Sequence, residues 1–123
     1  MMAVQVFPPH ELGRKGEKAA LRYLRKLGFQ ILEQSYRFGR GEIDLIARES
    51  NTLVFIEVKT RYASSFSSPE EAVTLHKQKQ IRSIAQAYLY AQHLEDIPCR
   101  FDVMALQFTS EAGFQIRLYR NAF

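Results

Sequence analysis

Apolar residues recur at helical spacing near the start of the chain and at strand spacing after it. From His10 to Leu27 the apolar and small residues lie three or four positions apart, which predicts an amphipathic helix that ends at Gly28. Three segments with the alternation and composition of β-strands follow it. They are residues 29–37, 42–48 and 53–61.

A second helix and two further strands are expected in the second half of the chain. The helix should begin near Ser68 or Pro69, because Ser68 can cap it and proline suits the first helical position. Ile97-Pro98 breaks the helical pattern, and residues 100–108 and 114–120 fit strands. The buried stripe of this helix should contain Val73, Ile81, Ile84, Ala85, Tyr88 and Ala91.

The expected order of elements is therefore α-β-β-β-α-β-β. A central mixed β-sheet flanked by helices, an α/β architecture, is the simplest way to bury the apolar stripes of both helices. The length of 123 residues fits one domain. We expect a flexible N-terminal arm, residues 1–9, and a single domain over residues 10–123.

Composition narrows the functional class only in part. The formal net charge of +4 and the pI near 9.4 are compatible with a polyanionic partner such as nucleic acid, and equally with charge that serves solubility. The single cysteine, Cys99, excludes an internal disulfide. The chain has neither an apolar run long enough to span a membrane nor the pattern of a signal peptide at its N-terminus. We expect a cytoplasmic protein without a membrane partner.

Charged residues interrupt the middle of an otherwise apolar hairpin, GEIDLIARESNTLVFIEVKTR. If residues 50–51 form a two-residue turn, Asp44 faces Glu57 and Glu42 faces Lys59. Because side chains alternate along a strand, Asp44, Glu57 and Lys59 should share one face. The other face should be apolar, with Ile43, Leu45, Val54, Ile56 and Val58.

Two directly opposed carboxylates repel each other and destabilise a hairpin unless something offsets their charge. Bound Mg²⁺ or Mn²⁺ would do so, because both ions prefer oxygen ligands, and Lys59 would add a positive charge on the same face. The alternative is that Asp44, Glu57 and Lys59 lie on an ordinary solvated face of the hairpin. The spacing alone leaves both interpretations open.

The sequences GEIDLI and VFIEVKTR resemble the core motif of the PD-(D/E)xK nuclease superfamily, with Asp44, Glu57 and Lys59 at its Asp…Glu-x-Lys positions. Ile43 stands where the name of the superfamily has proline. Over residues 11–108 the chain more closely resembles the bacterial YraN-like family, through GRKGEKAALRYLRKLGFQIL, GEIDLIA, VFIEVKTR, the segment from Pro69 to Leu89, and RFDVMAL. This resemblance implies a restriction-endonuclease-like fold, metal-dependent cleavage of phosphodiester bonds, and DNA as the substrate. The similarity to Holliday-junction resolvases suggests branched or structured DNA and a homodimer.

The resemblance also implies site residues. Glu17, beside the buried stripe of the first helix, would join Asp44 and Glu57 at the metal, and Glu17, Asp44, Glu57 and Lys59 would be catalytic; an ordinary solvated role for Glu17 stays open. A further set of basic residues would contact phosphates, although a solvated face is the alternative for each of them. These are Arg14, Lys18, Arg40, Arg61, Lys77 and Lys79.

Several residues keep two readings. Lys77 falls on the buried side of its helix, where it could reach the site or extend past the core. Glu42 could support the metal site or pair with Lys59, and Asp102 could pair with Arg100 or Arg61 or act in catalysis. For four aromatic residues near the hairpin, core packing is favoured over stacking on bases. They are Tyr36, Phe38, Tyr62 and Phe66.

The predicted function is thus metal-dependent hydrolysis of DNA. Two alternatives from other classes use the same fold. One is a nucleic-acid-binding module that does not cut, and the other is a protein-interaction domain.

Overall fold

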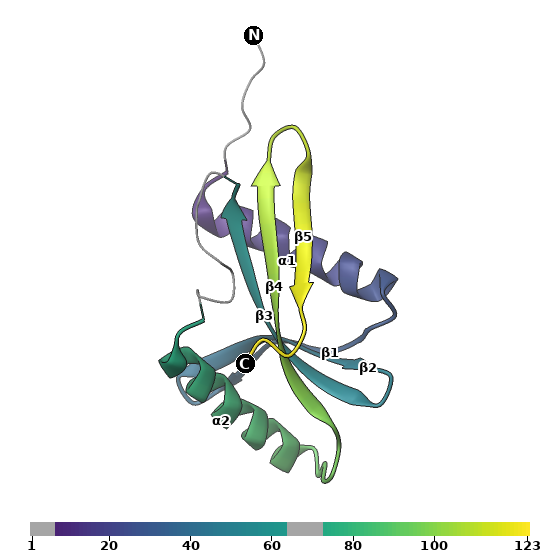
Figure 1. Ribbon diagram of the computed structural model, residues 1–123. Coiled ribbons are helices and arrows are strands. Elements are labelled where there is room, and N and C mark those ends of the chain that lie inside the picture. Colours follow the sequence, from purple (N-terminus) through teal and green to yellow (C-terminus); the bar gives the residue numbers. More distant parts are fainter. Residues whose placement is uncertain (1–6, 64–72) are drawn as a thin grey trace.

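The computed structural model describes residues 7–63 and 73–123 (Figure 1). Within these ranges the elements follow the predicted order α-β-β-β-α-β-β, which is confirmed. Every strand boundary lies within one residue of its predicted position. The elements are α1 (Pro9–Lys26), β1 (Gln30–Phe38), β2 (Gly41–Glu49), β3 (Thr52–Tyr62), α2 (Leu75–Ala91), β4 (Cys99–Thr109) and β5 (Gly113–Tyr119).

The strands form one mixed sheet with the order β1-β2-β3-β4-β5. Strands β3 and β4 are parallel, and the other neighbouring pairs are antiparallel. Helix α1 packs mainly on β3, and helix α2 packs on β2 and β1 (Figure 1). Each helix covers its own apolar cluster, so the predicted central mixed sheet flanked by helices is confirmed.

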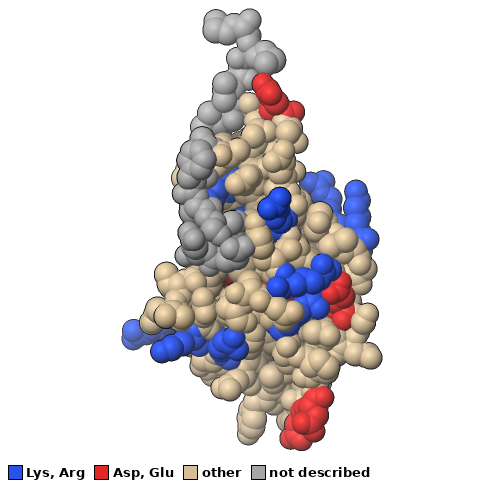
Figure 2. All heavy atoms as spheres, viewed as in Figure 1, with Lys and Arg blue, Asp and Glu red and all other residues tan. Residues whose placement is uncertain are grey.

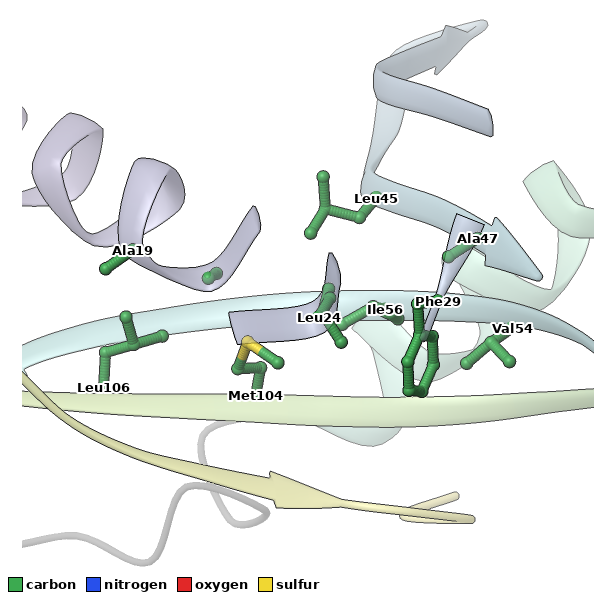
Figure 3. Close-up of a cluster of buried hydrophobic side chains, with 10 residues drawn as sticks. Ala19, Leu24, Phe29, Leu45, Ala47, Val54, Ile56, Met104 and Leu106 are labelled. Carbon is green, nitrogen blue, oxygen red and sulfur yellow. The ribbon is translucent and has the colours of Figure 1, made fainter. Parts of the chain in front are cut away.

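The cluster beneath α1 combines small residues of the helix with larger side chains of the sheet (Figure 3). Ala20 and Leu24 are fully buried against Ile56 of β3 and Met104 of β4. The apolar pattern from His10 to Leu27 predicted that Leu27 would lie in the buried stripe of this helix, but this prediction was wrong. It follows the last helical residue and is 45% exposed.

Helix α1 lies close to β3 at Gly16. A Cβ atom at this position would lie 2.7 Å from Cγ2 of Thr60 and 2.9 Å from its Cβ. Gly16 precedes Glu17, and Thr60 follows Lys59. The absence of a side chain at position 16 therefore sets how near two of the predicted site residues come to each other.

We expect Gly16→Ala to lower the free energy of unfolding by about 1–2 kcal/mol, because overpacking outweighs the gain in helix propensity. Urea denaturation measures this change. The matched control is the double variant Gly16→Ala/Thr60→Ala, which removes Oγ1 and Cγ2 of Thr60 but keeps its Cβ at 2.9 Å, and it should recover part of the loss. Equal stability of Gly16→Ala and the wild type would mean that α1 can move away from β3 at no cost.

Helix α2 begins at Leu75, and its first turn is capped by Thr74, whose hydroxyl oxygen accepts a hydrogen bond from the backbone N–H of Lys77 at 3.2 Å. The predicted start at Ser68 or Pro69 lies outside the described residues. The second cluster of buried residues lies beneath this helix and includes Ile81, Ile84, Ala85, Tyr88 and, ahead of the helix, Val73. Ala91 was predicted to be buried but is exposed, because the buried face of α2 ends at Tyr88.

Neither helix in the described ranges is both long and apolar enough to cross a membrane.

Candidate metal centre at the fork of the sheet

The predicted site lies where the sheet divides. The two-residue turn is confirmed, because Glu49 pairs with Thr52, and the β2–β3 ladder then runs back as far as Leu45 and Ile56. Beyond this pair β2 continues beside β1, while β3 continues beside β4 (Figure 1). One edge of β3 is therefore free of its neighbour strand from Glu57 onward.

Asp44 closes this fork with its side chain. Its Oδ2 atom accepts a hydrogen bond from the backbone N–H of Val58 at 2.8 Å, beyond the last β2–β3 pair. Ile43 packs beneath α2, whereas Leu45, two residues further on, packs beneath α1. The prediction that Ile43 shares a face with Leu45 was therefore wrong, because Ile43 lies beyond the last β2–β3 pair and is covered by α2.

Glu57 is 4% exposed, and its Oε2 atom has no hydrogen-bond partner among the described residues. The pKa of Glu57 is raised to about 8, first by burial of the carboxyl group and then by its hydrogen bond with Asp44 and the charge of Asp44. The positive charges of Lys77 and Lys59 lower this pKa but do not outweigh the other effects. At neutral pH Glu57 therefore holds its proton, and the pair carries one negative charge instead of two. A buried carboxyl oxygen without a hydrogen-bond partner indicates that a partner is missing.

Lys77 is the described side chain that comes nearest to supplying that partner. Its Nζ atom lies 3.6 Å from Oε2 of Glu57. Of the two predicted roles for Lys77, reaching toward the site is the one that the structure supports.

Lys59 follows Glu57 by two residues on β3 and is half-buried. Glu42, the other candidate partner of Lys59, instead forms a salt bridge with Arg37 of the neighbouring strand at 3.2 Å. Lys59 has no salt bridge with the described carboxylates, so its ammonium group is available to an incoming anion.

Glu17 faces the fork from α1. It lines a shallow cleft of about 320 Å³ together with Gly13, Val58, Lys59, Thr60 and Arg61. Partial burial, followed by the negative charges of Asp44 and Glu42, raises the pKa of Glu17. The carboxylate is thus near enough to sense Asp44, as expected for a residue that supports the same site.

The described residues contain no group of three or more His, Cys, Asp or Glu side chains placed to hold one ion. Asp44 and Glu57 form a closer pair, to which Glu17 is peripheral. This donor set fits Mg²⁺, which commonly takes one or two carboxylates and keeps water as its other ligands. It also fits Mn²⁺, since both ions prefer oxygen donors.

The raised pKa of Glu57 predicts a pH dependence of stability. The unfolded chain releases this proton near pH 4.5 and the native chain near pH 8, so the native state binds more protons between these values and loses stability as the pH rises through them. Glu57→Gln, which keeps a donor toward Asp44, should be more stable than the wild type at pH 8 by about 1–3 kcal/mol and nearly equal to it at pH 4.5. Urea denaturation across this range, without added metal, measures the difference. A constant difference between the two proteins would contradict the assignment.

The predicted phosphate contacts lie on three sides of the fork. Arg14 and Lys18 line a cleft of about 350 Å³ along α1, which also includes Glu17. Arg61 shares the cleft of Lys59, while Arg40 and Lys77 line a third one, of about 320 Å³, between the β1–β2 turn and α2. Lys79 is exposed on α2. Figure 2 shows lysine and arginine side chains in several separate groups over one face.

Asp102 belongs to a separate network beneath α1. It is fully buried and accepts hydrogen bonds from Nε of Arg100 at 3.0 and 3.1 Å and from the backbone N–H of Asn121 at 3.1 Å. Glu49 binds Arg100 and Arg120 through its two oxygens. Of the predicted roles for Asp102, the ion pair with Arg100 is confirmed. The alternation of Arg100 and Asp102 with apolar residues indicated this pair in advance, whereas no sequence pattern indicated Glu49 or Arg120.

The aromatic residues near the hairpin differ in whether they pack in the core. Tyr36 packs edge-on against Tyr88 with ring centroids 5.0 Å apart, and Tyr62 packs edge-on against the buried Phe108 at 6.1 Å. Core packing is thus confirmed for these two. It is wrong for Phe38, which is 55% exposed at the end of β1, and Phe66 lies outside the described residues.

Comparison with known proteins identifies the family of this chain. The model of the Uncharacterised protein family UPF0102 matches residues 16–106. A UPF0102 protein of Chlorobium phaeobacteroides (strain BS1) is 51% identical, and the match covers 81% of this chain and 79% of that protein. A UPF0102 protein of Caldicellulosiruptor saccharolyticus is 40% identical, and the match covers 92% of this chain and 97% of that protein. Among solved structures, SfsA of Pyrococcus furiosus in complex with Ca²⁺ is similar over 94% of this chain and 64% of the SfsA chain. The sequence identity is 13% and the TM-score is 0.38, a likeness too distant to carry an argument. The chain belongs to the UPF0102 family, which is the YraN-like family that its motifs resemble.

Proposed function

We propose that this protein is a cytoplasmic, metal-dependent nuclease that hydrolyses phosphodiester bonds of DNA. The observation that carries the proposal is the buried Glu57, whose Oε2 atom lacks a hydrogen-bond partner among the described residues and which lies beside Asp44 at the open edge of β3. Retaining two adjacent carboxylates here lowers the stability of the free protein at neutral pH. Binding of a cation between the two carboxylates during function would explain why the protein retains them despite the lower stability.

Asp44 and Glu57 would hold Mg²⁺ or Mn²⁺, with Glu17 supporting the site from α1. When bound, the ion would lower the pKa of a coordinated water and polarise a phosphoryl oxygen. Lys59 would orient the attacking water and stabilise the negative charge that develops on the phosphate. Its side chain suits this role because it is half-buried and has no salt bridge within the described residues.

The choice of DNA rests on the basic residues around the fork, because phosphates are bound by lysine and arginine side chains. Arg14, Lys18 and Arg61 line clefts on the α1 side, and Arg40 and Lys77 line the cleft on the α2 side. Their arrangement on three sides of the site favours a branched or structured DNA over a short linear duplex. One such site cuts one strand, so a paired cut would need a homodimer.

The first test asks for the metal site without assuming a substrate. The melting temperature is measured with and without Mn²⁺ for the wild type, for Asp44→Ala, and for Glu95→Ala, which removes an exposed carboxylate away from the fork. At tenfold excess over the dissociation constant, Mn²⁺ should stabilise the wild type and Glu95→Ala by about 1.4 kcal/mol, or roughly 4–6 °C. Asp44→Ala should show no rise.

No rise in the wild type, either alone or with branched DNA, would contradict the metal site. DNA binding that survives chelator, without cleavage under any divalent ion, would support the non-catalytic nucleic-acid module instead. Absence of DNA binding at low salt would support a protein-interaction domain.

A further inference from the structure

Lys77 enters the site from α2, the helix opposite the one that carries Glu17. Its Nζ atom lies 3.6 Å from Oε2 of Glu57, and its side chain is 33% exposed while that of Glu57 is 4% exposed. The contact therefore joins a buried carboxyl oxygen to an ammonium group that still touches solvent. Among the described residues no hydrogen bond reaches the same oxygen.

The separation of these two atoms is longer than in a tight charge pair, in which nitrogen and oxygen lie about 2.7–2.9 Å apart. Lys77 thus offsets the negative charge of the Asp44–Glu57 pair without forming the hydrogen bond that would fix the ammonium in place. The backbone of Lys77 is held separately, because its N–H donates to the cap residue Thr74. Only the flexible side chain has to move for the contact to break.

The same side chain also lines the cleft formed with Arg40, Glu42 and Gln80. An ammonium group that leaves Glu57 can therefore remain solvated in this cleft while α2 stays where it is. A divalent cation held by Asp44 and Glu57 would repel an ammonium group at this distance and take the oxygen that it faces.

We propose that Lys77 is the counter-ion of the free site, and that its ammonium group and the divalent cation compete for Glu57. This inference rests on the proposed metal site and assigns it a regulatory residue. Its consequence is that Lys77 weakens cation binding in the free protein. With Lys77 present, a higher cation concentration is needed to occupy the site than the two adjacent carboxylates alone would need.

The test measures Mn²⁺ binding to the full chain without DNA, from the electron paramagnetic resonance signal of free Mn²⁺ at pH 7.5. We expect Lys77→Gln to bind Mn²⁺ about three- to tenfold more tightly than the wild type, the range for loss of a partly exposed charge pair. Lys77→Arg keeps the charge and should bind as the wild type does. Lys79→Gln removes an exposed charge two residues away on the same helix and should also leave the affinity unchanged.

Equal or weaker binding by Lys77→Gln, while the wild type binds Mn²⁺, would overturn the competition but leave the proposed metal site intact. Tighter binding by Lys79→Gln to the same extent would also overturn it, since the effect would then be one of net charge. Failure of the wild type and of Lys77→Gln to bind Mn²⁺ without DNA would overturn this inference, and failure to bind it with branched DNA as well would overturn the proposed function. Lys77→Met, which keeps the aliphatic stem, gives the same readout if Lys77→Gln does not fold.

Discussion

Lys59→Ala is expected to lower metal-dependent cleavage of DNA by about 10²–10⁴-fold, the range for loss of a positioned proton-transfer or charge-stabilising group. The same variant should keep its melting temperature and its stabilisation by Mn²⁺. Lys59 has no salt bridge among the described residues, so removal of its charge leaves no partner uncompensated there. It also lies outside the Asp44–Glu57 pair that would hold the ion.

Loss of cleavage without loss of the Mn²⁺ effect distinguishes Lys59 from the carboxylates. Asp44→Ala should lose both cleavage and the Mn²⁺ effect, and it should also lose the hydrogen bond from the N–H of Val58 that closes the fork. Lys59→Arg tests geometry, because the guanidinium keeps the charge but not the compact shape of the ammonium. It should restore less than a tenth of the activity.

The assay uses a labelled four-way junction and a linear duplex of the same sequence, with Mg²⁺, Mn²⁺ or chelator. Lys26→Ala is the matched control, since Lys26 is exposed in the last turn of α1. Full cleavage by Lys59→Ala would remove this residue from the mechanism. Loss of the Mn²⁺ effect in Lys59→Ala would mean that the lysine supports the metal site and not the reacting groups.

The fold could be predicted from sequence because its signals are local. The boundaries of all five strands follow from alternation and from turn residues, and the turn at Ser50–Asn51 set the register of β2 against β3 correctly. The predicted cross-strand pairs Asp44–Glu57 and Glu42–Lys59 are not formed, because the ladder ends at Leu45 and Ile56. Leu27 and Ala91 were wrongly predicted to be buried, because helical periodicity does not reveal where a helix extends past the sheet that it covers.

The site could be predicted only in part because it lies where the regular pattern ends. Alternation placed Ile43 in the wrong cluster, since β2 is paired with β3 only as far as Leu45 and Ile43 beyond it packs beneath α2. The contact between Lys77 and Glu57 joins elements 20 positions apart and depends on how α2 lies across the sheet. Helical spacing could indicate that Lys77 points inward but not which group it would meet.

Asp102→Ala is expected to lower the free energy of unfolding by about 3–5 kcal/mol, the cost of breaking a buried ion pair from one side. Asp102 is fully buried, and its loss leaves Nε of Arg100 and the N–H of Asn121 without their acceptor. Arg100 is itself 12% exposed and would keep only Glu49, which it binds at 2.6 Å. Typical domains have a total stability of about 5–15 kcal/mol, so this variant should be partly unfolded at 37 °C.

Arg120→Ala is the control within the same network. Arg120 is 47% exposed and binds Glu49 at 2.9 Å, so its loss should cost less than about 1 kcal/mol. Urea denaturation at 10 °C measures both variants, and Mn²⁺ binding is measured there on the folded protein. Because Asp102 pairs with Ile56 on the α1 face while Glu57 pairs with Val103 above the α2 cluster, the affinity of Asp102→Ala for Mn²⁺ should equal that of the wild type. A stable Asp102→Ala protein that has lost cleavage would contradict this assignment and place Asp102 in the catalytic machinery.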